Sequence, residues 1–224
     1  MSKFISFSVL FIGLFFTSCI EIIDDLLILS DGSGTFKYTV NLSSSKVKIN
    51  SILALDSLNG EKVPSKEEIQ NKVKMFKSVL RKSYGIKNIE ITEDYTEYIV
   101  KLSCDFSDIY CLQLALVNCF DSISLNPQPE VKDFQWVDWT NTSLKRSIPN
   151  FLSLKKFKYD DKENELLKSG YYTTISRFDK EILDFSNENG KLSKSKKAYM
   201  HKIDIFSLKD NNQLLESTIN LKDN

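Results

Sequence analysis

The sequence predicts an α+β fold: an antiparallel sheet with two helices on one face, followed by a mostly β C-terminal half. Residues 35–42 alternate apolar and polar side chains, which is typical of a strand that buries one face. Residues 65–85 carry apolar side chains at helical spacing. The predicted elements follow the order strand, strand, helix, strand, strand, helix. That order is typical of helices laid on an antiparallel sheet.

The N-terminal segment is expected to be a signal peptide that is removed from the mature protein. Its apolar run, residues 4–16, has thirteen residues, whereas a helix needs about 20 to cross a membrane. Lys3 precedes the run, and the small residues Thr17 and Ser18 follow it. These are the three parts of a secretory signal, so we expect residues 1–18 to be cleaved off.

The residues around the expected cleavage point, Phe16-Thr17-Ser18-Cys19, resemble the lipobox of bacterial lipoproteins, with Phe16 where leucine is usual. The resemblance implies that Cys19 carries a diacylglycerol thioether and a further chain such as palmitate. Each buried methylene then contributes about 0.8 kcal/mol to membrane anchoring. Ile20 stands where an aspartate would favour the inner membrane, so the implied location is the outer membrane, on its periplasmic or its outer side. The alternative is a signal peptide followed by an ordinary thiol.

The charge balance argues against a nucleic-acid partner. Removal of residues 1–18 takes one lysine from the 30 basic residues and none of the 30 acidic ones, which leaves 29 against 30. Nucleic-acid-binding domains carry a basic excess. With 42% hydrophobic residues, the chain has enough apolar material for a buried core.

The first expected element is a β-hairpin that turns at residues 31–34, Asp-Gly-Ser-Gly, where the glycines accept a positive φ. Residues 46–58 are expected to form a short amphipathic helix. The buried face of the second hairpin strand is expected to consist of Phe36, Tyr38, Val40 and Leu42.

The helix over residues 65–85 has the strongest signals in the chain. Ser65 and Glu68 have the spacing of a capping box, and Gly85 ends the helix. A strand pair over residues 87–106, turning at residues 93–94, and a helix over residues 108–121 are expected next. The apolar stripe of the first helix consists of Ile69, Val73, Phe76, Leu80 and Tyr84.

Residues 126–129, Asn-Pro-Gln-Pro, break this periodicity. We expect them to separate an α+β half, residues 19–126, from a mostly β half, residues 127–224, and the two halves are compatible with one domain. Strands of the second half are expected at residues 134–140, 156–159, 171–178, 182–186, 198–206 and 214–221.

Three cysteines remain after Cys19: Cys104, Cys111 and Cys119. This odd number allows at most one internal disulfide. In a helix, Cys111 and Cys119 lie about 12 Å apart along the axis, which is beyond disulfide reach. Either Cys104 is bridged to one of the others, or all three are buried apolar thiols.

Motifs for catalysis are scarce. His201 is the only histidine, so zinc sites with several histidines are excluded, and a histidine inside a predicted strand is typically a packed or surface residue. The sequence has neither a dinucleotide-binding glycine motif nor a phosphate-binding loop. Adjacent acidic pairs have the spacing of solvated turns and helix starts. We therefore expect no enzyme activity, no cofactor and no metal.

Two segments are candidates for a binding patch. Residues 133–139 place Phe134 and Trp136 on one face of a strand and Val137 and Trp139 on the other. Either both faces are covered by core, or one of them binds an aromatic ligand or a partner. The second segment is a predicted hairpin tip, which either contacts anionic lipid head groups or is a solvated turn. Its candidate residues are Lys194, Lys196 and Lys197.

The layout of the chain resembles the LppM-type domain of bacterial lipoproteins. The lipobox, the strand pair turning at DGSG, the capped helix and the second strand pair carry the resemblance. So does the segment FDKEILDFSNENGKLSKSKKAYMHKIDI, which leads to a last strand. The resemblance implies an α+β envelope domain that binds apolar ligands.

We therefore expect a cell-envelope lipoprotein, anchored to a membrane by Cys19, whose mature domain binds a lipid or other amphiphile or an envelope protein. A cavity between a helix and the sheet would support the first of these. The alternative is a structural or assembly subunit without a small-molecule ligand, in which residues 134–139 pair with another subunit.

Overall fold

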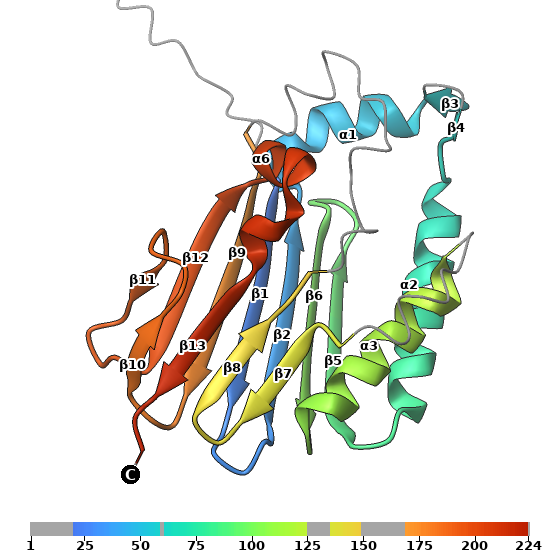
Figure 1. Cartoon of the computed structure of the whole chain (residues 1–224). Helices are drawn as coiled ribbons and strands as arrows, with labels where there is room; N and C mark the ends of the chain where they lie inside the picture. The colour runs from blue at the N-terminus through green and yellow to red at the C-terminus, as the bar shows by residue number, and fades with distance from the viewer. Residues whose placement is uncertain (1–19, 59–60, 125–134, 149–168, 224) are drawn as a thin grey trace, which may run out of the picture.

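The computed structural model describes residues 20–58, 61–124, 135–148 and 169–223. They form an α+β fold, as the sequence predicts, with two sheets packed face to face and helices beside the smaller sheet (Figure 1). The large sheet has seven strands in the order β11-β12-β9-β1-β2-β6-β5. Its strands are β1 Glu21–Ile28, β2 Gly34–Asn41, β5 Ile86–Asp94, β6 Ile99–Phe106, β9 Tyr171–Phe178, β11 Lys191–Leu192 and β12 Ala198–Asp204.

The central strand β1 joins the two halves of the chain. It pairs antiparallel with β2 and parallel with β9, so strands from before and after residues 126–129 share one sheet. The other neighbouring pairs of this sheet are antiparallel. The proposed division at residues 126–129 itself lies outside the described residues, as does the strand expected at 156–159.

One face of the large sheet carries the second layer (Figure 1). A four-stranded sheet of order β10-β13-β8-β7 lies over its β12 side, and α2 and α3 lie over its β5 side. The buried core runs between these layers and includes Ile28, Phe106, Leu116 and Leu144. The covering elements are α2 Lys66–Lys82, α3 Ile109–Ile123, β7 Val137–Thr140, β8 Ser143–Arg146, β10 Ile182–Phe185 and β13 Ser217–Leu221.

Local signals position these elements. The hairpin turn holds Gly32 at φ +84°, and a side chain at Gly34 would collide with the Leu27 carbonyl oxygen, so both glycines are required. The capping box of α2 is confirmed: Ser65 Oγ accepts from Glu68 N at 3.1 Å, and Ser65 N donates to Glu68 Oε2 at 2.7 Å. Each such cap stabilises a helix by about 1 kcal/mol.

Several predicted boundaries are wrong. The helix of residues 65–85 ends at Lys82, because Ser83 turns to an extended backbone with ψ 132°, and Tyr84 is consequently 88% exposed instead of completing the apolar stripe. The strand predicted for residues 198–206 ends at Asp204, whose carboxylate caps α6, Ile205–Asp210, by accepting from Ser207 N.

Four further segments differ from the prediction in extent. Residues 93–94 belong to β5, and the turn follows them, because Asp94 Oδ1 accepts the backbone N–H groups of Thr96 and Glu97. Residues 212–215 are a 3-10 helix, so the last strand begins at Ser217. Of the strand expected at residues 134–140, the described residues form a strand only at β7, Val137–Thr140. The helix of residues 46–58 is α1, Lys46–Leu53, followed by a short pairing of β3, Ser57–Leu58, with β4, Glu61–Lys62.

The three described cysteines are free. Cys104 and Cys119 are fully buried, and burial raises the pKa of each thiol to about 12, so neither is a thiolate near neutral pH. Cys111 is half-buried. The structure therefore corresponds to the thiol alternative, with two of the three cysteines fully buried.

A buried ion pair connects the two sheets. Arg146 of β8 donates to Asp24 Oδ2 of β1 at 2.5 Å, and their side chains are 7% exposed. The Tyr172 hydroxyl donates to the same oxygen at 3.4 Å. Burial by itself lowers the pKa of Arg146, but the charge and hydrogen bond of Asp24 outweigh it and raise that pKa. Arg146 therefore stays charged, and the Asp24 carboxylate is the group that faces it.

Removing one partner of this pair should be costly. We expect Arg146→Met to lower the free energy of unfolding by about 3–5 kcal/mol, because it leaves the Asp24 carboxylate buried without a counter-charge. Urea denaturation measures the loss, and Lys145→Met, at an exposed position of the same strand, is the control. The double variant Asp24→Leu/Arg146→Met should recover much of the loss. Equal effects of Arg146→Met and Lys145→Met would contradict this role.

Candidate functional site

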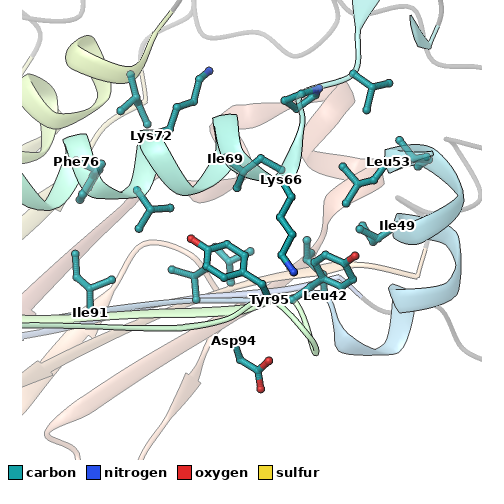
Figure 2. A pocket seen from close by; sticks show the side chains of 18 of the residues that line it. Leu42, Ile49, Leu53, Lys66, Ile69, Lys72, Phe76, Ile91, Asp94 and Tyr95 are labelled. Atoms are coloured by element: carbon teal, nitrogen blue, oxygen red, sulfur yellow. The ribbon is translucent and has the colours of Figure 1, made fainter. Parts of the chain in front are cut away.

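A large apolar pocket lies between the sheet and the helices α1 and α2 (Figure 2). Its volume is about 960 Å³, near the upper end of the roughly 300–1,000 Å³ typical of ligand sites. Most of its lining side chains are aliphatic or aromatic.

The floor of the pocket is the inner face of β2, β6 and β5. Strand register places Tyr38 beside Leu102 and Leu102 beside Ile91, and the next row pairs Val40 with Val100. These side chains share a face because every second residue of a strand points the same way. The floor therefore runs from the middle of the sheet toward the edge at which β2 ends.

Two helices form the walls. On α2, Ile69 and Phe76 face the sheet (Figure 2), and Val73, at helical spacing between them, also lines the pocket. The C-terminal part of α2 packs into the core through Phe76, Val79 and Leu80, whereas Ile69 and Val73, nearer its start, line the pocket. Further apolar lining comes from α1 and neighbouring segments: Leu42, Ile49, Ile52, Leu53, Leu58, Val63, Pro64, Phe120 and Ile123.

Polar groups at the pocket are few and mainly basic. Lys62 is paired with Glu68 at 2.7 Å. Among the described residues, no carboxylate pairs with Lys66 or Lys72. Figure 2 shows Lys66 reaching across the cavity toward the sheet, while the Asp94 carboxylate points away from α2. The Lys66 Nζ lies 5.9 Å from the centroid of the Tyr95 ring. The Lys66 ammonium therefore faces the cavity, and the Asp94 carboxylate does not point toward it.

The aromatic residues of the predicted binding patch lie at the core. Trp139 is 9% exposed and stacks on Phe178 with ring centroids 6.0 Å apart. Trp136 is partly buried against the same core. The burial of Trp139 corresponds to the core alternative for this strand. Phe134 lies outside the described residues.

The predicted lysine cluster lies at the other end of the large sheet from the pocket. Lys194, Lys196 and Lys197 are exposed in the turn before β12. The backbone oxygen of Lys197 accepts from Phe178 N, at the last residue of β9, and its Nζ donates to the Asp179 carbonyl at 2.6 Å. The turn that carries these lysines therefore adjoins Phe178, on which the buried Trp139 stacks, and the lysines are not part of the pocket lining.

A cavity between a helix and the sheet was the feature that lipid binding would require, but the sequence did not predict that it exists or which residues line it. The inward faces of residues 36–42 and of the capped helix were predicted, but their alternation and helical spacing do not show that the two faces stand apart. The sequence also did not show that Tyr95, Ile49 and Leu53 line a pocket. A short amphipathic helix has the same apolar pattern whether it lies on the surface or covers a cavity. Cys19 lies outside the described residues, and Ile20, which follows it, is described.

His201 is buried, with 4% of its surface exposed. It stands opposite Thr174 in the sheet, and its Nδ1 lies 3.4 Å from the Asn187 amide nitrogen. Burial lowers its pKa below the ordinary value of 6.5. In the described residues, no cluster of three or more histidine, cysteine or acidic side chains is arranged to hold a metal, and no helix has the length and apolar character to cross a membrane.

Comparison with protein-family models and with curated proteins yields no match. Among solved structures, the chain is similar to the NMR structure of the folded domain of the Mycobacterium tuberculosis LppM protein. The TM-score is 0.42 and the identity 11%, over 92% of this chain and 91% of that one. A likeness this distant transfers no function or site to this chain.

Burial of His201 should make stability depend on pH. The unfolded chain takes up a proton at His201 near pH 6.5, whereas the folded state takes it up only at lower pH. The contribution of neutral His201 to the free energy of unfolding is therefore complete above pH 6.5 and is lost as the pH falls below that value. Each unit of pKa difference corresponds to about 1.4 kcal/mol. We expect His201→Gln to lose less unfolding free energy than the wild type when the pH is lowered from neutral to about 5. Parallel pH profiles in urea denaturation would show that His201 protonates freely in the fold.

Proposed function

We propose that the mature domain binds a lipid or other amphiphile in the pocket under α1 and α2, on a cell-envelope lipoprotein anchored through Cys19. The observation that carries this proposal is the apolar cavity of about 960 Å³. Its walls offer hydrophobic contact over their whole length and few directional hydrogen bonds. Such a surface suits a flexible hydrocarbon chain better than a polar metabolite.

The physical gain is large enough to hold an acyl chain. Transfer of ten methylenes from water into an apolar site contributes about 8 kcal/mol, before the cost of ordering the chain. The Lys66 ammonium, which pairs with no carboxylate of the described residues, then favours a head group that carries negative charge, such as a carboxylate or phosphate. An anionic amphiphile therefore fits both the apolar walls and the Lys66 ammonium.

The expected location follows from the N-terminal segment. The signal peptide and the lipobox resemblance of residues 16–19 support export and acylation of Cys19. An exported protein held at a membrane has lipid within reach. The alternative, an assembly subunit without a small-molecule ligand, predicts an empty pocket.

Filling the pocket should abolish ligand binding. We expect Val73→Trp to weaken binding of a fluorescent fatty acid at least about tenfold, because the indole replaces several methylenes of ligand at about 0.8 kcal/mol each. Met75→Trp is the matched control, since Met75 lies on the same helix, is 45% exposed and does not line the pocket. Fluorescence titration gives the affinities, and native mass spectrometry of residues 20–224 shows whether lipid co-purifies. Equal binding by both variants would place the ligand elsewhere, and no binding by the wild type would contradict the proposal.

Acylation of Cys19 can be tested in cells. Labelled palmitate should enter the full-length protein expressed in a bacterium, and Cys19→Ala should lose the label and leave the membrane fraction. Cys111→Ala, which keeps the lipobox intact, is the control. Label that persists in Cys19→Ala would contradict attachment at this residue.

A further inference from the structure

The pocket extends to the end of the large sheet at which β1 begins and β2 ends. At this end of the strands, pairing places five residues in one row across the sheet: Tyr171, Glu21, Asn41, Ile99 and Asp94. Three segments leave from it: α1 follows β2, the turn of residues 95–98 follows β5, and α6 follows β12. Figure 1 shows α1 and α6 together at this end of the molecule. Leu42, Tyr95 and Tyr98, which line the pocket, belong to the same end.

Ile20 fixes the chain at this edge. Its carbonyl oxygen accepts from Tyr171 N at 2.7 Å, so the sheet pairing already includes the residue directly after Cys19. A side chain at Gly170 would come within 3.0 Å of the Ile20 Cβ and 2.9 Å of Ile205, which shows how closely this corner is packed. Consecutive Cα atoms are about 3.8 Å apart. An acylated Cys19 would therefore hold this edge at the membrane without a flexible tether.

The helix at this end of the sheet lies on the surface of the fold. No side chain of α1 is buried. Its polar contacts to the rest of the fold include the Lys46–Glu97 ion pair at 2.5 Å and the hydrogen bond from the Tyr98 hydroxyl to Asn50 Oδ1. On its outer side Val47 is 82% exposed, and Leu55, just beyond its end, is 47% exposed. Its inner side chains, Ile49, Ile52 and Leu53, cover the pocket.

We propose that residues 46–55 are a membrane-contacting gate, through which a lipid of the bilayer that holds Cys19 enters the pocket. The inference rests on the proposed function and adds the source of the ligand and its route. Val47 and Leu55 contact the interface of the bilayer. Displacement of α1 exposes the apolar floor to lipid without passage through water.

The far end of the sheet cannot serve the same purpose. The seven steps from Tyr171 to Phe178 along β9 span about 23 Å. The exposed lysine turn and Leu183, which is 63% exposed, lie near the Phe178 end, because Ile182 N donates to the Lys196 carbonyl. This distance exceeds the roughly 5–10 Å to which interfacial residues enter a bilayer.

The test measures which end touches lipid. Full-length acylated protein is reconstituted in vesicles of phosphatidylglycerol and phosphatidylethanolamine whose chains are brominated. An environment-sensitive fluorophore is attached at Val47→Cys or Leu55→Cys, in a Cys111→Ser background. Leu183→Cys is the matched control, another exposed apolar residue, at the far end. We expect bromine quenching at positions 47 and 55 to be at least about twofold stronger than at 183, and lipid bound to the wild-type protein in native mass spectra.

Each outcome decides the matter. Bound lipid together with selective quenching at 47 and 55 supports the gate. Bound lipid with equal or stronger quenching at 183 overturns the gate and leaves the proposed function intact. A wild-type protein that takes up no lipid overturns the proposed function, and the gate with it.

Discussion

The parallel pairing of β1 with β9 is the constraint on which the rest of the structure depends. It makes β1 the middle strand of a sheet built from both halves of the chain. A slip of one residue would turn Asp24, Leu26 and Ile28 from the covered face to the solvent face. The buried Asp24–Arg146 pair adds a second requirement, since it is satisfied only when the small sheet lies over this register.

The pocket results from uneven cover over one continuous face. Toward the end of the sheet where β2 begins, α3 and the small sheet share one buried core with Phe36 and Phe106. Toward the edge where β2 ends, the cover is the start of α2 together with α1. An empty apolar cavity forfeits packing contacts and lowers stability. A ligand that binds only the folded state returns stability in proportion to its concentration and affinity.

Much of the fold could be predicted from the sequence because its signals are local. The hairpin, the capped helix and strand 171–178 were confirmed, and each depends on turn chemistry, capping or alternation within a few residues. The end of β12 was predicted wrongly because an aspartate can either continue a strand or cap a helix, and the sequence around Asp204 does not decide between the two. The pocket was missed for a different reason: whether Ile69 and Val73 touch Val40 and Val100 or stand apart from them depends on the position of α2, which α3 and β5 determine. Trp136 and Trp139 show the same limit, because a strand with two apolar faces does not reveal which layers cover it.

The proposed anchor and pocket meet at one end for a physical reason. Moving an acyl chain from a bilayer into water costs about 0.8 kcal/mol of free energy for each methylene exposed. Transfer of a lipid through water to a cavity far from the membrane would therefore have a large free-energy barrier. A cavity that opens at the interface avoids most of that exposure. Such an opening requires a cover that can separate from the core at small cost, and α1, which buries no side chain, meets this requirement where α2, with Leu80 fully buried, does not. The absence of buried side chains in α1 is therefore consistent with a moving part, and the rigid attachment of Ile20 to Tyr171 is consistent with a fixed one.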